Sequence, residues 1–180
     1  MKIGRVAPAL LASLLLSAGL LTADDQRKGF IVGAGLGAGS VTYLSDWAWE
    51  LWRWRESGVA ANFKIGYAPS NSLEIFVMSG GMFFPREGSK DTLGIVGGGL
   101  AKYVKPEGTG LFFTGGIGLS VLNRSSWEGY SLETGFGFLA GLGYEPVKHL
   151  SVQADFFSAI LFAGHERASG WRVTLNYLFY

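Results

Sequence analysis

A histidine and a carboxylate are adjacent near the end of the chain, as His165 and Glu166. A serine hydroxyl activated by a histidine, which a carboxylate orients, is the arrangement of a hydrolytic or acyl-transfer site. Ser125, Ser126 and Ser169 are the hydroxyls that could complete such a set at one rim of the fold. A single histidine in a loop is more often simply solvated, so the sequence favours a protein without catalytic residues.

Metal, cofactor and nucleic-acid chemistry find little support in the composition. The chain has no cysteine and only 2 histidines, so it offers no convincing metal site. Its Gly-x-Gly repeats follow a strand-like alternation and do not form a credible phosphate-binding loop. Lysine and arginine are scattered and the net charge is +1, unlike the basic footprint of a nucleic-acid binder. We expect no cofactor and no nucleic-acid partner.

The first residues have the layout of a signal peptide. Lys2 and Arg5 precede an uncharged, leucine-rich run from Val6 to Ala23. Cleavage after Ala23 would leave residues 24–180 as one mature domain. The alternative is an uncleaved anchor helix, because about 17 apolar residues can already span hydrocarbon.

Apolar residues recur at every second position through the rest of the chain, a period that a strand produces and a helix does not. No later stretch is apolar enough to cross a membrane as a helix, so any embedding must use strands. A strand needs about 9–11 tilted residues to cross. The alternation predicts strands over 30–39, 59–67, 73–78, 92–104, 110–122, 132–144, 149–162 and 169–180.

Short and long connections alternate along the chain. Short, proline-marked turns stand at 69–71, 105–108 and 145–148, and longer polar segments at 44–57, 85–91, 123–131 and 163–168. Short turns on the periplasmic side and long loops outside are the arrangement of outer-membrane barrels. Aromatic residues near the strand ends predict two interfacial girdles, one of Tyr67, Tyr103, Tyr144 and the final Tyr177-Leu178-Phe179-Tyr180, the other of Phe83, Trp127, Tyr130, Phe162 and Trp171.

The signal peptide, amphipathic strands, proline-containing turns and terminal aromatic residue resemble the small OmpA/OmpX-type outer-membrane barrels. This resemblance implies an all-β fold, an eight-stranded antiparallel up-and-down transmembrane β-barrel in a Gram-negative outer membrane. It also implies outer-membrane lipids and lipopolysaccharide as partners, a host or surface ligand as a further candidate, and a monomer. One departure is that Phe179, and not the final Tyr180, shares the apolar parity of the last strand.

Polar residues at the intervening positions predict a network inside the barrel. Counting back across the turn at Pro69 places Lys64 roughly opposite Glu74, which predicts a cross-strand ion pair near the periplasmic end. A second pair, Glu133 with Arg172, could form through the lumen toward the extracellular end. Such pairs neutralise charges in a narrow barrel, and a gate or proton path is the functional alternative. The predicted network consists of Lys64, Glu74, Lys102, Glu133, Asp155 and Arg172.

The other inward positions are divided between glycines and bulky apolar residues. An eight-stranded barrel is only just wide enough for its own side chains, so a filled interior is expected. A pocket for an acyl chain or another small apolar molecule is the alternative. The bulky residues that would form the plug or the pocket are Phe76, Met78, Met82, Phe112 and Phe157.

The first long loop has the densest cluster of tryptophan in the chain. Tryptophan prefers the membrane interface, so this loop is expected to form the rim of the barrel or a short interfacial helix. The alternative is a binding surface for lipopolysaccharide or a host ligand, whose phosphates the arginines would meet. The loop residues concerned are Trp47, Trp49, Trp52, Trp54, Arg53 and Arg55.

The sequence therefore predicts a non-enzymatic, integral outer-membrane barrel that contributes to envelope integrity or surface interaction. One alternative is the binding or passage of small apolar molecules through a lumen pocket. The other is a lipid A-modifying acyl-transfer or deacylase enzyme.

Overall fold

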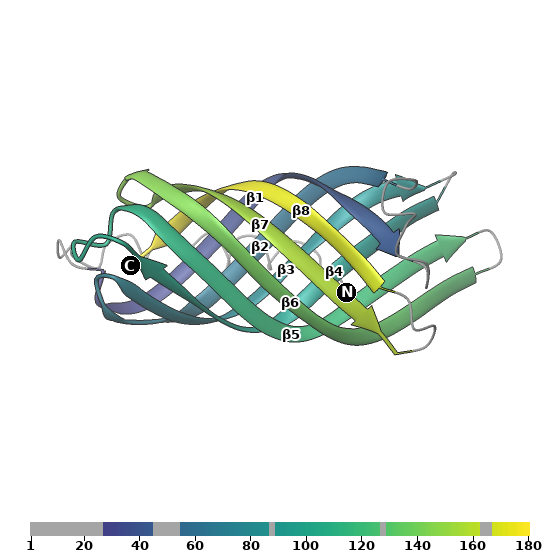
Figure 1. The fold of residues 1–180 in the computed structure, drawn as a ribbon, viewed down its shortest axis with the longest axis horizontal. Helices are drawn as coiled ribbons and strands as arrows, with labels where there is room; N and C mark the ends of the chain where they lie inside the picture. The colour runs from purple at the N-terminus through teal and green to yellow at the C-terminus, as the bar shows by residue number, and fades with distance from the viewer. Residues whose placement is uncertain (1–26, 45–54, 87–88, 127–128, 163–166) are drawn as a thin grey trace, which may run out of the picture.

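The computed structural model describes residues 27–44, 55–86, 89–126, 129–162 and 167–180. In these ranges eight antiparallel strands follow one another, and each pairs with its sequence neighbours. β1 also pairs with β8, which closes the sheet into a barrel (Figure 1). The predicted eight-stranded up-and-down barrel is confirmed. The strands are β1 (Gly29–Leu44), β2 (Arg55–Ser70), β3 (Leu73–Arg86), β4 (Ser89–Tyr103), β5 (Gly110–Ser126), β6 (Gly129–Val147), β7 (Leu150–Leu161) and β8 (Arg167–Phe179).

The strands extend farther into the long connections than the periodicity predicted. β2 begins at Arg55, β3 runs to Arg86 and β5 runs to Ser126. Polar residues interrupt the apolar alternation at these ends. The backbone hydrogen bonds between strands nevertheless continue there, because a strand segment that lies outside the membrane needs no apolar face. The predicted signal peptide, residues 1–23, lies outside the described residues.

Side chains alternate between the outer surface and the lumen along each strand. In β8, Trp171, Val173 and Leu175 are exposed, whereas the intervening Arg172 and Thr174 are buried. Closure of the sheet pairs the backbone groups of all strands and leaves no free edge. No helix in the described ranges is both long enough and apolar enough to span a membrane.

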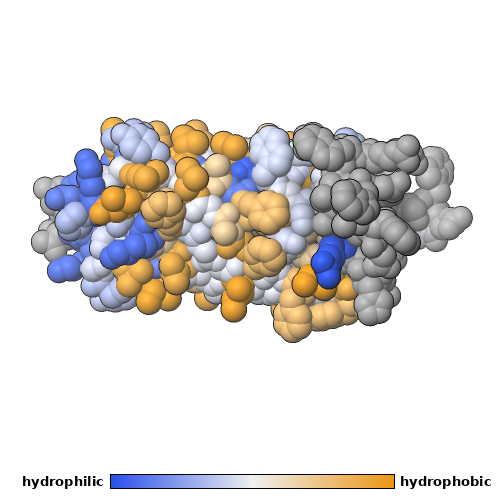
Figure 2. Space-filling view, in the orientation of Figure 1, coloured by the Kyte–Doolittle hydropathy of each residue, from blue (hydrophilic) through white to orange (hydrophobic). Residues whose placement is uncertain are grey.

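The outer surface carries a belt of large apolar side chains. Ile117 is 73 % exposed, Leu36 68 % and Phe136 63 %. Figure 2 shows apolar residues across the middle of the barrel and hydrophilic residues at the end with the short turns. Water-soluble monomers rarely expose a contiguous apolar surface of this extent. The belt is therefore the part of the barrel that hydrocarbon would solvate.

The lumen is filled by large side chains that lie against glycines of other strands. A Cβ atom added at Gly143 would collide with the ring of Phe112, and one at Gly170 with the ring of Phe157. The same relation holds for Phe76 over Gly99 and for Met78 over Gly116, and all of the bulky residues predicted to face inward, Met82 included, are buried. Glycine on one strand thus makes room for a large residue on another.

A small cavity remains inside the barrel, toward the long connections. It has a volume of about 10 Å³, and its lining includes Gly80, Met82, Ile95, Phe157 and Arg172. A volume of about 10–15 Å³ holds one water molecule, so this space is far too small for an acyl chain.

Candidate functional site

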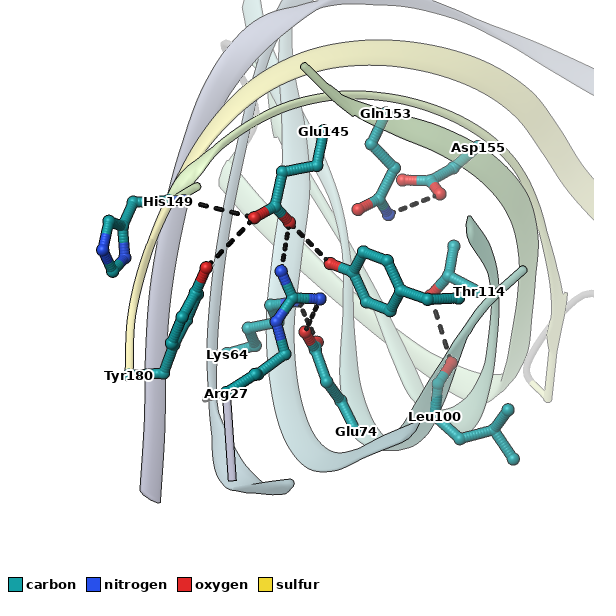
Figure 3. A network of polar contacts seen from close by, with 11 residues as sticks. Arg27, Lys64, Glu74, Leu100, Thr114, Glu145, His149, Gln153, Asp155 and Tyr180 are labelled. Carbon is teal, nitrogen blue, oxygen red and sulfur yellow. Dashed lines mark hydrogen bonds and ion pairs between the residues drawn. The ribbon is translucent and has the colours of Figure 1, made fainter. Parts of the chain in front are cut away.

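A buried cluster of charged residues crosses the lumen at the end that carries the short turns (Figure 3). Arg27, two residues before β1, reaches Glu145 at the end of β6 and Glu74 at the start of β3. Its Nη2 lies 2.5 Å from Glu145 Oε2, and its Nη1 lies 3.1 Å from Glu74 Oε1. All three side chains are almost fully buried.

A second cation completes the cluster. Lys64 of β2 places its Nζ 2.6 Å from Glu74 Oε2, so the predicted ion pair forms. The ladder sets Lys64 opposite Met78 and not opposite Glu74, so the pair is diagonal across the two strands. Two cations therefore face two carboxylates, and the cluster is neutral. This balance matters because removing one partner of a buried pair leaves a charge whose desolvation costs several kcal/mol.

Glu145 accepts hydrogen bonds from three further groups. The Tyr103 hydroxyl donates to its Oε2 at 2.9 Å, and the Tyr180 hydroxyl donates to its Oε1 at 3.3 Å. The backbone N–H of His149 donates to Oε1 at 3.2 Å. The Arg27 guanidinium also lies 3.8 Å from the centre of the Tyr103 ring, a cation–π geometry. Glu145 therefore links the N-terminal segment, β4, the turn before β7 and the C-terminus.

His149 ties this turn to the last strand. Its backbone has a φ of 73°, which is uncommon for a residue other than glycine. Its Nδ1 lies 2.8 Å from the carbonyl oxygen of Leu178, and its own carbonyl accepts from the Leu178 N–H at 2.8 Å. The ring also packs against Tyr180, with centroids 4.4 Å apart. These contacts hold the C-terminus over the mouth of the barrel.

The cluster keeps Arg27 charged and Tyr180 neutral. Burial alone would lower the pKa of Arg27, but Tyr103, Glu74 and Glu145 raise this pKa above its ordinary value. Burial raises the pKa of the Tyr180 phenol. Tyr180 therefore remains a hydrogen-bond donor to Glu145 at physiological pH.

A second buried ion pair lies on the β7–β8 wall of the barrel. Asp155 and Arg172 are directly opposite in the ladder, and Arg172 Nε donates to Asp155 Oδ2 at 3.0 Å. Gln153 donates to the other oxygen of Asp155 at 2.7 Å. The side chains of Asp155 and Arg172 are 0 % and 5 % exposed, so the pair is shielded from water.

A third pair lies toward the long connections. Arg124 Nη1 lies 3.0 Å from Glu133 Oε1, and both side chains remain partly accessible. The predicted pair between Glu133 and Arg172 is therefore wrong, because each of the two has a partner on an adjacent strand. Asp155 and Arg172 are ladder partners, and Arg124 and Glu133 are diagonal neighbours on adjacent strands, whereas a contact through the lumen would have to cross packed side chains.

Two predictions for β4 are wrong. Lys102 was expected in the lumen network, but it is exposed and donates to the Ser72 hydroxyl at 3.0 Å. Tyr103 was expected in an aromatic girdle, but it points inward and is 2 % exposed. Both errors have one cause: β4 carries apolar residues on both parities, and the inward set includes Leu93 and Ile95. A lysine near the membrane interface can hold its charge in water while its stem covers apolar surface.

The sequence reasoning missed Arg27 and Glu145. Glu145 was assigned to a turn, yet it continues the inward parity of Leu139, Gly141 and Gly143 in β6. Arg27 likewise shares the inward parity of Ile31. Extending the alternation beyond the apolar run at each strand end would have found both residues.

Several predicted residues cannot be placed. Residues 47–54, which include the four loop tryptophans and Arg53, lie outside the described residues, as do His165, Glu166 and the side chains of Arg55, Ser125 and Ser126. Ser169 is described, and its hydroxyl lies 2.8 Å from that of Ser158. In the described ranges no group of three or more histidine, aspartate or glutamate residues could hold a metal ion.

Comparison with known proteins shows similarity in structure and not in sequence. No protein-family model and no curated protein matches the chain. Ail of Yersinia pestis, solved in complex with the heparin analogue sucrose octasulfate, is similar with a TM-score of 0.60 and 14 % identity, over 84 % of this chain and 99 % of Ail.

Two further solved barrels give the same result. Neisserial surface protein A matches with a TM-score of 0.54 and 14 % identity, over 83 % of this chain and 96 % of that protein. OprG from Pseudomonas aeruginosa matches with a TM-score of 0.51 and 9 % identity, over 87 % of this chain and 99 % of OprG. With its closed sheet, apolar belt and filled lumen, the chain has the fold of the small eight-stranded outer-membrane β-barrels.

Proposed function

We propose that this protein is a non-enzymatic, integral outer-membrane barrel that contributes to envelope integrity or surface interaction and does not act as a pore. The observation that carries this proposal is the neutral cluster of the buried Arg27, Glu74 and Glu145 with the half-buried Lys64, across the short-turn end of the lumen.

Opening a path for ions past this cluster would separate charges in a region from which water is excluded. Arg27, Glu74 and Glu145 are at most 2 % exposed. Separating a buried pair leaves uncompensated charge, at a cost of about 3–5 kcal/mol. The apolar residues above the cluster pack against glycines, and the cavity beside them holds no more than a water molecule. These features favour a filled barrel over passage of small apolar molecules.

A filled barrel acts through its outer surfaces. Its apolar belt suits membrane lipid, and its long connections would face the cell exterior. Ail, which has the same fold, was solved with a heparin analogue. That complex supports surface binding of an anionic ligand as one role for this chain. The tryptophans and arginines of residues 47–55 are the candidate surface for such a ligand, the alternative to a rim or interfacial helix in the sequence prediction.

Reconstitution in planar lipid bilayers tests the proposal. Residues 24–180, the proposed mature chain, are expected to insert, to resist protease in the strand region, and to produce no stable stepwise ion currents. An established porin of known conductance, reconstituted in the same bilayers, serves as the positive control. Regular single-channel steps from the folded protein would contradict the proposal, as would failure to insert.

A further inference from the structure

The outer face of β4 to β7 is hollowed by a groove of about 650 Å³. One wall is a row of ladder partners that crosses the strands, formed by Val96, Leu119, Phe136 and Ile160. The opposite wall, two residues along each strand, is formed by Ile117 and Phe138.

The floor of the groove is bare backbone. Gly97, Gly118 and Gly137 are consecutive ladder partners on β4, β5 and β6, and they lie between the two walls. Gly98 interrupts the second wall on β4, and a Cβ atom added there would meet no atom within 4 Å. Gly97, Gly118 and Gly137 stand at inward positions, so Gly98 is where the outer face of the groove lacks a side chain, and an elongated molecule can approach the sheet more closely there.

The end of the groove at Ile160 approaches a positive charge. Ile160 is the ladder partner of Arg167, the first residue of β8, and Arg167 is exposed on the same outer face. The first wall begins at Ile160, beside the long connections, and runs obliquely across the strands to Val96 in the middle of β4. The lining of the groove is thus apolar, and a positive charge lies beside its end nearest the long connections.

We propose that this groove binds one acyl chain of an anionic outer-leaflet lipid, whose phosphate or other acidic headgroup pairs with Arg167. This inference rests on the proposed function, because it requires the belt to lie in a membrane. The volume of the groove falls within the range of about 300–1,000 Å³ that is typical of ligand sites. In hydrocarbon the preference for such a groove comes from close packing and headgroup pairing, since bulk lipid is equally apolar.

Native mass spectrometry tests the proposal with the mature chain in nanodiscs of equal parts phosphatidylcholine and phosphatidylglycerol. We expect one phosphatidylglycerol to remain on each wild-type barrel after release from the disc. Gly98→Leu fills the groove and is expected to reduce retention about tenfold, which corresponds to about 1.4 kcal/mol. Ala34→Leu places a leucine side chain at an outward-facing position of β1, away from the groove, and is expected to leave retention unchanged.

Arg167→Gln separates headgroup recognition from chain packing. This variant is expected to retain a lipid but to lose the preference for phosphatidylglycerol over phosphatidylcholine. Wild-type retention by Gly98→Leu would overturn the proposal, and so would an unchanged preference in Arg167→Gln. If the wild type forms dimers and Gly98→Leu abolishes them, the groove is a contact between two copies of the chain. That result would also overturn the lipid-binding proposal. Failure of the wild type to enter nanodiscs would count against the membrane barrel itself, whereas normal insertion without lipid retention would count against the groove alone.

Discussion

Replacing Glu145 by alanine is expected to lower the free energy of unfolding by about 3–5 kcal/mol, the cost of breaking a buried ion pair. The change leaves the buried Arg27 with one carboxylate instead of two. It also removes the acceptor of the Tyr103 and Tyr180 hydroxyls and of the His149 N–H. Glu145→Gln keeps an acceptor without the charge, so it should lose less stability than the alanine variant.

Urea unfolding of the barrel in lipid vesicles, followed by tryptophan fluorescence, measures this effect. The matched control is Glu107→Ala, which removes an exposed carboxylate from a short turn at the same end of the barrel. Exposed substitutions of this kind usually change stability by no more than about 0.5 kcal/mol. Equal free energies of unfolding for the Glu145→Ala and Glu107→Ala variants would show that the buried cluster does not stabilise the barrel.

Asp155→Ala is expected to lower the free energy of unfolding by a similar amount, about 3–5 kcal/mol, because it leaves the buried guanidinium of Arg172 without its carboxylate. The Arg172 side chain is 5 % exposed and makes its ion pair with Asp155. Gln153 would lose its acceptor at the same time. Glu133→Ala is the comparison, since its pair with Arg124 is partly accessible to water and its loss should be smaller.

A double-mutant cycle identifies the ion pair as the cause. If Arg172→Met is added to Asp155→Ala, both members of the pair are removed, so neither is left as an unpaired buried charge. The double variant should therefore lose less stability than the sum of the two single variants, with a coupling of about 1–3 kcal/mol. Strict additivity in the same unfolding assay would mean that the two side chains act independently.

The architecture could be predicted because it depends on local regularities. Period-two alternation in β1 and β8 fixes which side chains face outward, and proline marks the short turns. The Lys64–Glu74 pair was accessible because a short turn brings the two strands together, although the register places Lys64 opposite Met78 and the pair is diagonal. Contacts within one hairpin are therefore accessible from the sequence.

The rest of the polar cluster depends on closure of the barrel. Arg27 and Glu145 are separated by 118 positions, and they meet because β1 pairs with β8. No local pattern encodes such a contact across the lumen. The inward-facing side of β4 could not be predicted from the sequence either. Leu93 and Ile95, which face inward, are as apolar as Val96 and Leu100, which face outward. There the side of the strand that faces inward is decided by packing of the whole lumen.

The central claim is that alternate positions of one strand face lipid and the enclosed lumen. The chain contains no cysteine, so single cysteines can be placed at each position from Val173 to Tyr177 in β8 and labelled with a small fluorophore. In vesicles that contain nitroxide lipids, labels at residues 173, 175 and 177 should be strongly quenched and those at 174 and 176 only weakly. Equal quenching at all five positions, or the opposite alternation, would contradict the account.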